Sequence, residues 1–264
     1  MHSGVRGVLF VFAFVYVSAF VKAQQSSISS PPKRDQQAIS ILSQCLQAAG
    51  GTQVISNIQD FTGSGTITYG DQTQGSVTIK GRGLTQFRVD ANLPDGVHSW
   101  IVSKGLAFQR IPDGSTSPLP SQNAVKSAIA TFPLPYLFSV LQDTSISISY
   151  GGLVTHDGAQ VYDILVQKTL TPSTDPLNTV GDATKAHFFI DPKALVIVSV
   201  QDSAFRKDGG PGASAHEMQF SNYQNVSGLS VPFSISEFIA GQKTSTIQLT
   251  QLTFNSDLTD ADFD

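Results

Sequence analysis

The feature that most constrains the fold is a change of hydrophobic periodicity near residue 61. From there on, apolar and polar residues alternate with the period of two that is typical of β-strands, and short glycine-rich turns separate the alternating segments. Five such segments fill residues 61–111, and the alternation resumes at residue 146 and continues to residue 254. Each segment has one apolar and one polar face. The pattern predicts a mainly β (α+β) chain: an antiparallel meander of about eleven strands with one dry face.

Residues 35–49 predict an N-terminal helix, because their apolar residues recur at helical spacing from Ala38 to Ala49. Asp35 is placed to cap its first turn, and two glycines follow at the expected end. Cys45, the one cysteine of the chain, belongs to the apolar stripe. We therefore expect a buried thiol, and no intrachain disulfide can form.

A second interruption of the strand pattern lies in the middle of the chain, over residues 121–143. Its apolar residues suggest helical pieces, which Pro133 and Pro135 are expected to break, since proline lacks the backbone donor. We predict a kinked, apolar helical lid there. Residues 112–120 and 172–182 are predicted to be loops because they are rich in Pro, Ser, Thr and Gly.

The N-terminal residues have the composition of an export signal. Residues 1–23 combine a basic start, an apolar run and a small-x-small end, which is typical of a cleaved signal peptide; a retained membrane anchor is the alternative. Residues 24–34 are polar and contain proline, and we expect a disordered linker. A single domain over residues 35–264 follows. We expect a periplasmic or secreted protein without an integral membrane segment in its mature chain.

Charge excludes one class of partner. Removal of Arg6 and Lys22 with the signal peptide would leave 14 basic and 20 acidic residues, a net charge of −6. Nucleic-acid binding needs a concentrated basic face, so we expect no nucleic-acid partner. Charged residues make up 14% of the chain, against about 25% in typical domains, which suits a β-rich exported protein.

Motifs for catalysis are missing from the sequence. His98, His156, His187 and His216 are expected on separate strands or turns in surface roles, without the spacing of a zinc site. There is no nucleophile elbow and no phosphate-binding loop before a helix. The acidic residues 257–264 lack the glycine and glutamate of a calcium loop and are expected to form a solvated tail. The sequence predicts no enzyme, no metal and no cofactor.

Aromatic residues are the better candidates for function. A broad apolar sheet face must be covered, and we expect one helix with one broken insertion to leave part of it as a cavity. Ordinary core packing is the alternative for each residue. The predicted ligand-binding residues are Phe87, Trp100, Phe108, Leu134, Tyr136, Phe138, Tyr162, Phe188 and Phe220.

Short motifs carry a family resemblance. They are Ala48-Ala49-Gly50-Gly51, Ile190-Asp191-Pro192-Lys193, Phe220-Ser221-Asn222-Tyr223, Gly228-Leu229-Ser230-Val231-Pro232 and Thr253-Phe254-Asn255-Ser256-Asp257-Leu258. Over residues 35–264 the chain resembles the LolA/LolB-like periplasmic proteins of bacteria and neighbouring uncharacterised exported families. The resemblance implies an unclosed barrel of about eleven strands with helices as a lid, whose best-known members hold lipoprotein acyl chains in the cup.

Two hypotheses follow. The first is a non-enzymatic binder of a lipid or acyl chain, including that of a lipoprotein, in the apolar cup. The second is an interaction or sensor module with a core filled by its own side chains, which would bind a protein partner through a loop or an exposed edge strand. The presence or absence of an internal cavity distinguishes them.

Overall fold

A computed structural model describes residues 32–124, 132–170, 175, 179–206 and 212–264. The signal peptide expected over residues 1–23 and the linker up to residue 31 lie outside the described residues. The described residues belong to one compact unit. In these parts of the chain, no helix has both the length and the apolar composition needed to cross a membrane.

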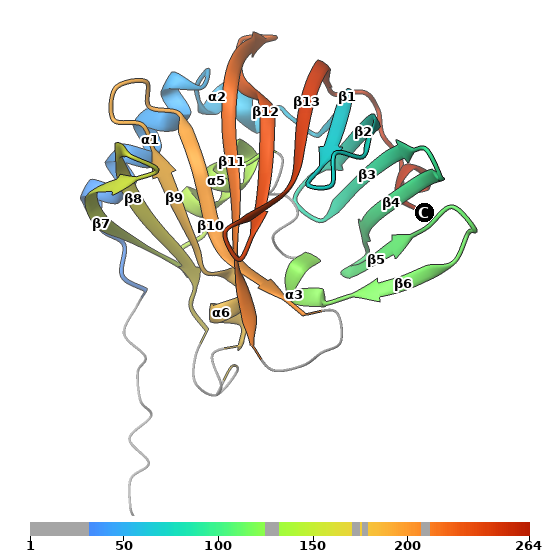
Figure 1. Cartoon of the computed structure of the whole chain (residues 1–264). Coiled ribbons are helices and arrows are strands. Elements are labelled where there is room, and N and C mark those ends of the chain that lie inside the picture. The colour runs from blue at the N-terminus through green and yellow to red at the C-terminus, as the bar shows by residue number, and fades with distance from the viewer. Residues whose placement is uncertain (1–31, 125–131, 171–174, 176–178, 207–211) are drawn as a thin grey trace, which may run out of the picture. The chain divides into compact units, whose positions relative to one another are not determined.

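The described residues form a 13-stranded sheet in which every neighbouring pair is antiparallel (Figure 1). The strands are β1 (Asp60–Tyr69), β2 (Gln74–Arg82), β3 (Gln86–Leu93), β4 (Gly96–Ser103), β5 (Leu106–Arg110), β6 (Thr116–Leu119), β7 (Ile146–His156), β8 (Ala159–Lys168), β9 (Ala186–Ile190), β10 (Ile197–Phe205), β11 (Ala213–Val226), β12 (Leu229–Ile239) and β13 (Gln242–Phe254).

The order of the strands shows why the barrel stays open. The chain runs from β1 to β6 at one edge, crosses to β7 at the other edge, and returns strand by strand to β13, which pairs with β1. The edges β6 and β7 do not pair with each other. The predicted unclosed, mainly β architecture is confirmed, with thirteen strands in the described residues where about eleven were expected.

The predicted N-terminal helix is present as α1 (Gln36–Ala48), followed by a short α2 (Thr52–Ser56). The Asp35 carboxylate accepts hydrogen bonds from the backbone N–H groups of Gln37 and Ala38, at 2.9 and 3.3 Å. The chain leaves α1 through Gly50, whose φ of 131° disfavours any side chain. A Cβ atom there would also lie 2.5 Å from the Gly228 carbonyl oxygen. Both the backbone conformation and the lack of space therefore require glycine at this position.

The mid-chain helices are α3 (Ser121–Ala124) and α5 (Leu134–Gln142). The expectation that Pro133 and Pro135 break a helix was wrong. Pro133 is the N-cap of α5 and Pro135 lies in its first turn, where the backbone N–H groups have no acceptor within the helix and a proline costs nothing. The prolines therefore begin the helix.

Two predicted loops contain regular structure. Within residues 112–120, β6 forms the sheet edge, and Pro118 is tolerated there because the outer side of an edge strand needs no donor. Within residues 172–182, the helix α6 (Thr179–Thr184) begins. The Asp175 carboxylate caps it by accepting the N–H groups of Thr179 and Val180, both at 2.8 Å.

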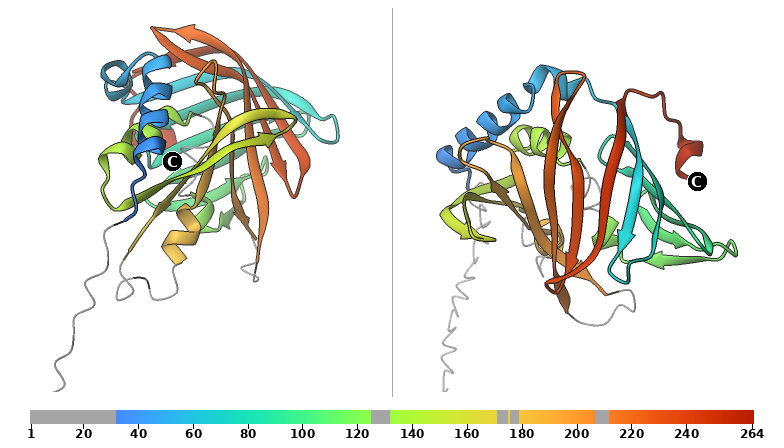
Figure 2. Two further views of the ribbon diagram at one scale, coloured as in Figure 1. Left: turned by 90° about the vertical axis from the view of Figure 1, so that its left-hand side faces the viewer. Right: turned by 45° about the horizontal axis from the view of Figure 1, so that its top comes forward.

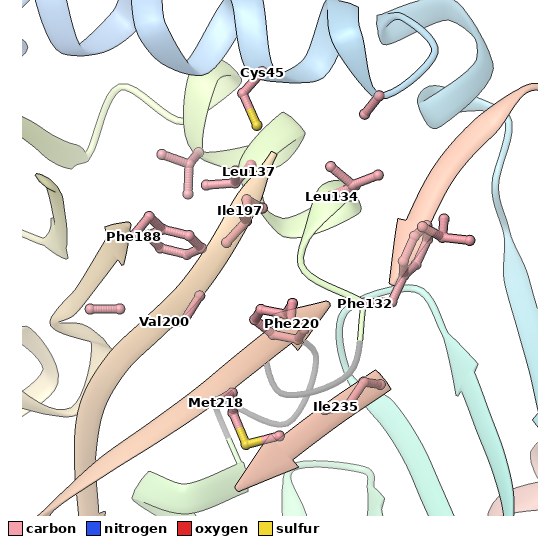
Figure 3. Close-up of a cluster of buried hydrophobic side chains, with 14 of the residues drawn as sticks. Cys45, Phe132, Leu134, Leu137, Phe188, Ile197, Val200, Met218, Phe220 and Ile235 are labelled. Atoms are coloured by element: carbon pink, nitrogen blue, oxygen red, sulfur yellow. The ribbon is translucent and has the colours of Figure 1, made fainter. Parts of the chain in front are cut away.

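The main core lies between the sheet and the pair α1 and α5, which Figures 1 and 2 show on the same side of the curved sheet. Figure 3 shows Cys45 of α1 pointing toward Leu137 of α5 and the strand residues below it. The predicted buried thiol of Cys45 is confirmed, and burial raises its pKa to about 12.

Arg34 is fixed to the sheet and to α5, although it was expected at the end of a disordered linker. It forms a parallel bridge with Ile148 of β7. Its guanidinium donates hydrogen bonds of 2.8–3.3 Å to four carbonyls at the end of α5 and the start of β7, those of Val140, Leu141, Asp143 and Ile146. One side chain thus satisfies helix-end acceptors that the helix itself cannot.

The acidic C-terminus is not the solvated tail that the sequence suggested. Residues 260–263 form the 3₁₀ helix η1 (Asp260–Phe263) against β3 and β4, and Phe263 is fully buried. Asp262 pairs with Lys80 at 2.7 Å, and Asp260 pairs with Arg82 at 2.6 Å. The acidic residues find these partners because alternation places the basic side chains of β2 on the convex face.

Candidate ligand cavity

A cavity of about 380 Å³ opens on the concave face and is lined by residues of β1, β3–β6 and β10–β13. This volume lies within the range of ligand pockets, roughly 300–1,000 Å³. Its apolar lining includes Ile67, Val89, Trp100, Val102, Met218 and Ile247.

Strand alternation explains which residues line the cavity. Trp100 of β4 lies directly opposite Val89 of β3, and residues two positions along a strand share its face. The Trp100 ring lies near the Tyr69 ring, with centroids 6.4 Å apart. Met218, labelled in Figure 3, both packs into the main core and lines the cavity, so it marks the boundary between the filled and the hollow part of the cup.

The short helix α3 lies at one end of the cavity. Its Ala124 and Asn123 belong to the lining. The Asn123 amide donates to the Phe205 carbonyl at 3.0 Å and accepts from the Phe205 N–H at 2.9 Å, which ties α3 to the end of β10. This two-way hydrogen bond fixes the position of α3 beside the opening.

The predicted site residues separate into groups. Phe87 and Trp100 line the cavity. Phe138 lines a second hollow of about 210 Å³, which Phe87 also borders. The structure thus places three of the nine residues at hollows, and Phe87 is common to both.

The other six predicted residues lie elsewhere. Leu134 of α5 and the strand residues Phe188 and Phe220 are buried in the main core, and Tyr136 stacks on Phe188 with centroids 6.1 Å apart. Tyr162 packs edge-on against Tyr150 at 6.2 Å. Phe108 follows the cavity-lining Ala107 and so faces the opposite side of the sheet, where the Arg110 guanidinium lies 6.0 Å from its ring.

The sequence analysis missed a polar cluster in the cavity wall. His216 Nδ1 lies 2.7 Å from Asp202 Oδ1, and His216 Nε2 lies 3.4 Å from Glu237 Oε1. Thr244 donates a 2.7 Å hydrogen bond to the other Glu237 oxygen. The expected surface role of His216 was therefore wrong. The available signal was its spacing, because His216 shares a strand face with Met218 and Phe220.

These contacts set the charges of the cluster. Burial alone would lower the pKa of His216, but hydrogen bonds and charge attraction from Asp202 and Glu237 raise it to about 9. Burial alone would raise the pKa of Glu237, but hydrogen bonds from His216 and Thr244 hold it below its usual value. At neutral pH the His216 imidazolium thus lies between the side chains of Asp202 and Glu237.

Tyr69 also lines the cavity wall, on the same side as Glu237. Its hydroxyl is enclosed and has no hydrogen-bond partner among the described residues. Burial, and then the negative charge of Glu237, raises the pKa of Tyr69 to about 12. The hydroxyl stays protonated, so it remains a donor without an acceptor.

A different polar network lies on the convex face. His156, Asp157 and Glu217 each place one atom that could bind a metal within 4.8 Å of the others. Glu217 already accepts hydrogen bonds from Ser199 at 2.6 Å and Gln201 at 3.0 Å, and His156 lies 2.9 Å away. With its oxygens occupied, Glu217 serves to order the outer sheet surface.

Comparisons with known proteins are informative at the level of the fold. No protein-family model matches the chain, and no curated protein matches it significantly. Among solved structures, a domain assigned to outer membrane lipoprotein sorting from Vibrio parahaemolyticus superposes with a TM-score of 0.53 and 11% identity. That match covers 86% of this chain and 96% of the other.

Two further structures agree. A DUF1329 family protein from Desulfovibrio piger has a TM-score of 0.53 at 10% identity and covers 88% of this chain and 98% of its own. A LolA superfamily protein from Nitrosomonas europaea has a TM-score of 0.50 at 13% identity, with coverage of 86% and 97%. The chain has a LolA-like fold. In this LolA-like chain, α1 and α5 cover one part of the concave face, and the cavity lies over another part.

Proposed function

We propose that the chain is an exported, periplasmic, non-enzymatic binder of a lipid-like ligand, whose apolar part occupies the cavity beside Trp100. The observation that carries the proposal is the 380 Å³ cavity, which is far larger than the roughly 30 Å³ share of one water molecule. A core filled by its own side chains would leave no such space. A similar solved structure is assigned to lipoprotein sorting, which agrees with an acyl-chain ligand.

The expected affinity follows from burial of the chain. Each buried methylene contributes roughly 0.8 kcal/mol, so about ten methylenes contribute about 8 kcal/mol before the cost of association. A net 8 kcal/mol would correspond to a micromolar dissociation constant, so after the cost of association the expected dissociation constant lies above the micromolar range. Trp100 and the neighbouring valines supply apolar contact surface, while Phe188 and Phe220 stabilise the main core.

The test begins with the full chain exported to a bacterial periplasm, native mass spectrometry of the purified protein, and organic extraction. We expect a co-purified lipid-like molecule or stoichiometric uptake of an added acyl chain. Trp100→Glu should abolish uptake in a protein that still folds. The matched control is Phe108→Glu, on the neighbouring strand but facing away from the cavity, which should keep uptake.

An apo mass with no uptake of added fatty alcohol, fatty acid or phospholipid would overturn the proposal. It would favour the alternative, an interaction or sensor module with a protein partner. Loss of uptake in both variants equally would mean that the ligand does not lie beside Trp100.

A further inference from the structure

We propose that Phe87 sets the length of the apolar chain that the cavity accepts, because its side chain separates the cavity from the second hollow of about 210 Å³. This inference rests on the proposed function, since it takes the apolar chain of the ligand to lie in the cavity. A chain that fills the cavity ends at Phe87, and each further methylene stays in water.

The strand register places Phe87 between the two hollows. Phe87 of β3 lies directly opposite Gly81 of β2 on one side and Val102 of β4 on the other. Residues directly opposite each other on neighbouring strands share one face of the sheet, so these three lie in a row on the concave face. Gly81 lines the smaller hollow, Val102 lines the cavity, and Phe87 lines both. The Phe87 side chain therefore stands at the boundary of the two spaces.

The other end of the smaller hollow is a wall of packed rings. Phe61 of β1 lies opposite Gly81, and a Cβ atom at Gly81 would overlap the Phe61 ring, so this ring lies over the glycine. Phe61 packs edge-on against Phe132 with centroids 5.4 Å apart, and the Phe132 and Phe254 centroids are 5.3 Å apart. The smaller hollow thus lies between this aromatic wall and Phe87.

The smaller hollow suits the end of an apolar chain. Its lining includes Ile55 of α2, Leu84 at the turn after β2 and Phe138 of α5. If about ten methylenes fill the cavity of 380 Å³, the hollow of 210 Å³ has room for about five more. Each methylene that becomes buried raises the affinity by about fourfold. Removal of the Phe87 ring should therefore let the protein bury a longer chain.

The experiment titrates the full chain with saturated primary alcohols from octanol to octadecanol. Trp100 is the only tryptophan of the sequence and lines the cavity, so its fluorescence reports when a chain enters. In the unaltered protein the affinity should rise by about fourfold for each added carbon and then level off. The carbon number at which it levels off is the length limit, and it marks the chain that reaches Phe87.

Variants on either side of the boundary assign the length limit to Phe87. In Phe87→Ala the limit should lie about four carbons higher, because the chain continues into the smaller hollow. The matched control is Val89→Ala, two residues along the same strand in the cavity lining, which should weaken binding without moving the limit. Adding Ser139→Leu to Phe87→Ala should restore the original limit, since Ser139 lines the smaller hollow and leucine would fill it. Alcohol solubility is the same for every variant, so a shift between variants reports the site.

The outcomes separate the two proposals. If no alcohol of any length binds, the proposed function itself fails. If alcohols bind but Phe87→Ala keeps the original length limit, or Val89→Ala moves it equally, the role of Phe87 is refuted while the proposed function stands. Circular dichroism checks that Phe87→Ala folds. If it does not, Phe87→Leu, which removes less of the side chain, must give a smaller shift in the same direction, and no shift would refute the proposal.

Discussion

Replacing His216 with glutamine tests the charge cluster in the cavity wall most directly. Glutamine keeps a similar size and can still donate a hydrogen bond, but it carries no charge between Asp202 and Glu237. The imidazolium is held at 2.7 and 3.4 Å from the two carboxylates and is largely buried. The variant therefore removes the positive charge that both side chains contact, and the fold should lose stability.

The size of the effect follows from the raised pKa of His216. A rise from 6.5 to about 9 corresponds to about 3 kcal/mol, at 1.36 kcal/mol for each pKa unit. Because the folded-state pKa is the higher one, the folded protein binds the proton more tightly. The contribution is fully present below about pH 6.5 and is lost as the pH rises through 9. About 2 kcal/mol should remain at pH 7.5 and less than about 0.5 kcal/mol at pH 9.

The assay is urea denaturation of both proteins at several pH values from 6 to 10, followed by tryptophan fluorescence and circular dichroism. The difference in free energy of unfolding should shrink steadily as the pH rises. His98→Gln is the control, since His98 pairs with the exposed Asp95 at a turn and should change stability by less than about 1 kcal/mol. A difference for His216→Gln that stays constant from pH 6.5 to 10 would refute the reasoning.

Three further predictions concern the framework. Arg34→Ala should cost about 2 kcal/mol, because it leaves several carbonyls at the end of α5 without donors, whereas Lys33→Ala should change little; equal denaturation midpoints would contradict this. Gly50→Ala should cost more than Gly158→Ala in thermal unfolding, since both have positive φ but only Gly50 lacks space for a Cβ atom. Cys45 should react with a thiol reagent only after denaturation; fast reaction of the folded protein would disprove its burial.

The sequence pattern predicted an element correctly wherever interactions between residues close in the chain control its structure. The spacing from Ala38 to Ala49 and the cap at Asp35 defined α1, because helix periodicity and capping act within a few residues. Alternation defined most strands and their dry face. The prolines of α5 show the limit of such rules. Pro133 and Pro135 are compatible either with the interruption of a helix or with its first turn. Only the structure shows that the helix begins at these residues.

The residues of the candidate site were harder to predict from the sequence than the secondary structure was. Trp100 and Phe87 were identified as cavity residues because they are aromatic and lie on the dry face. Aromatic character alone could not separate them from Phe188 and Phe220, which are buried in the main core. Which part of the face a helix covers depends on packing between segments far apart in the chain.

By itself, the sequence determined that this chain builds a single-faced antiparallel sheet with an N-terminal helix and a buried thiol, since hydrophobic periodicity and turn residues act locally. Only the tertiary structure decided which part of the cup holds a cavity and that His216 meets Asp202 and Glu237 in its wall. Those facts depend on the register of β10, β11 and β12 and on the position of α3, where contacts between distant residues set the geometry.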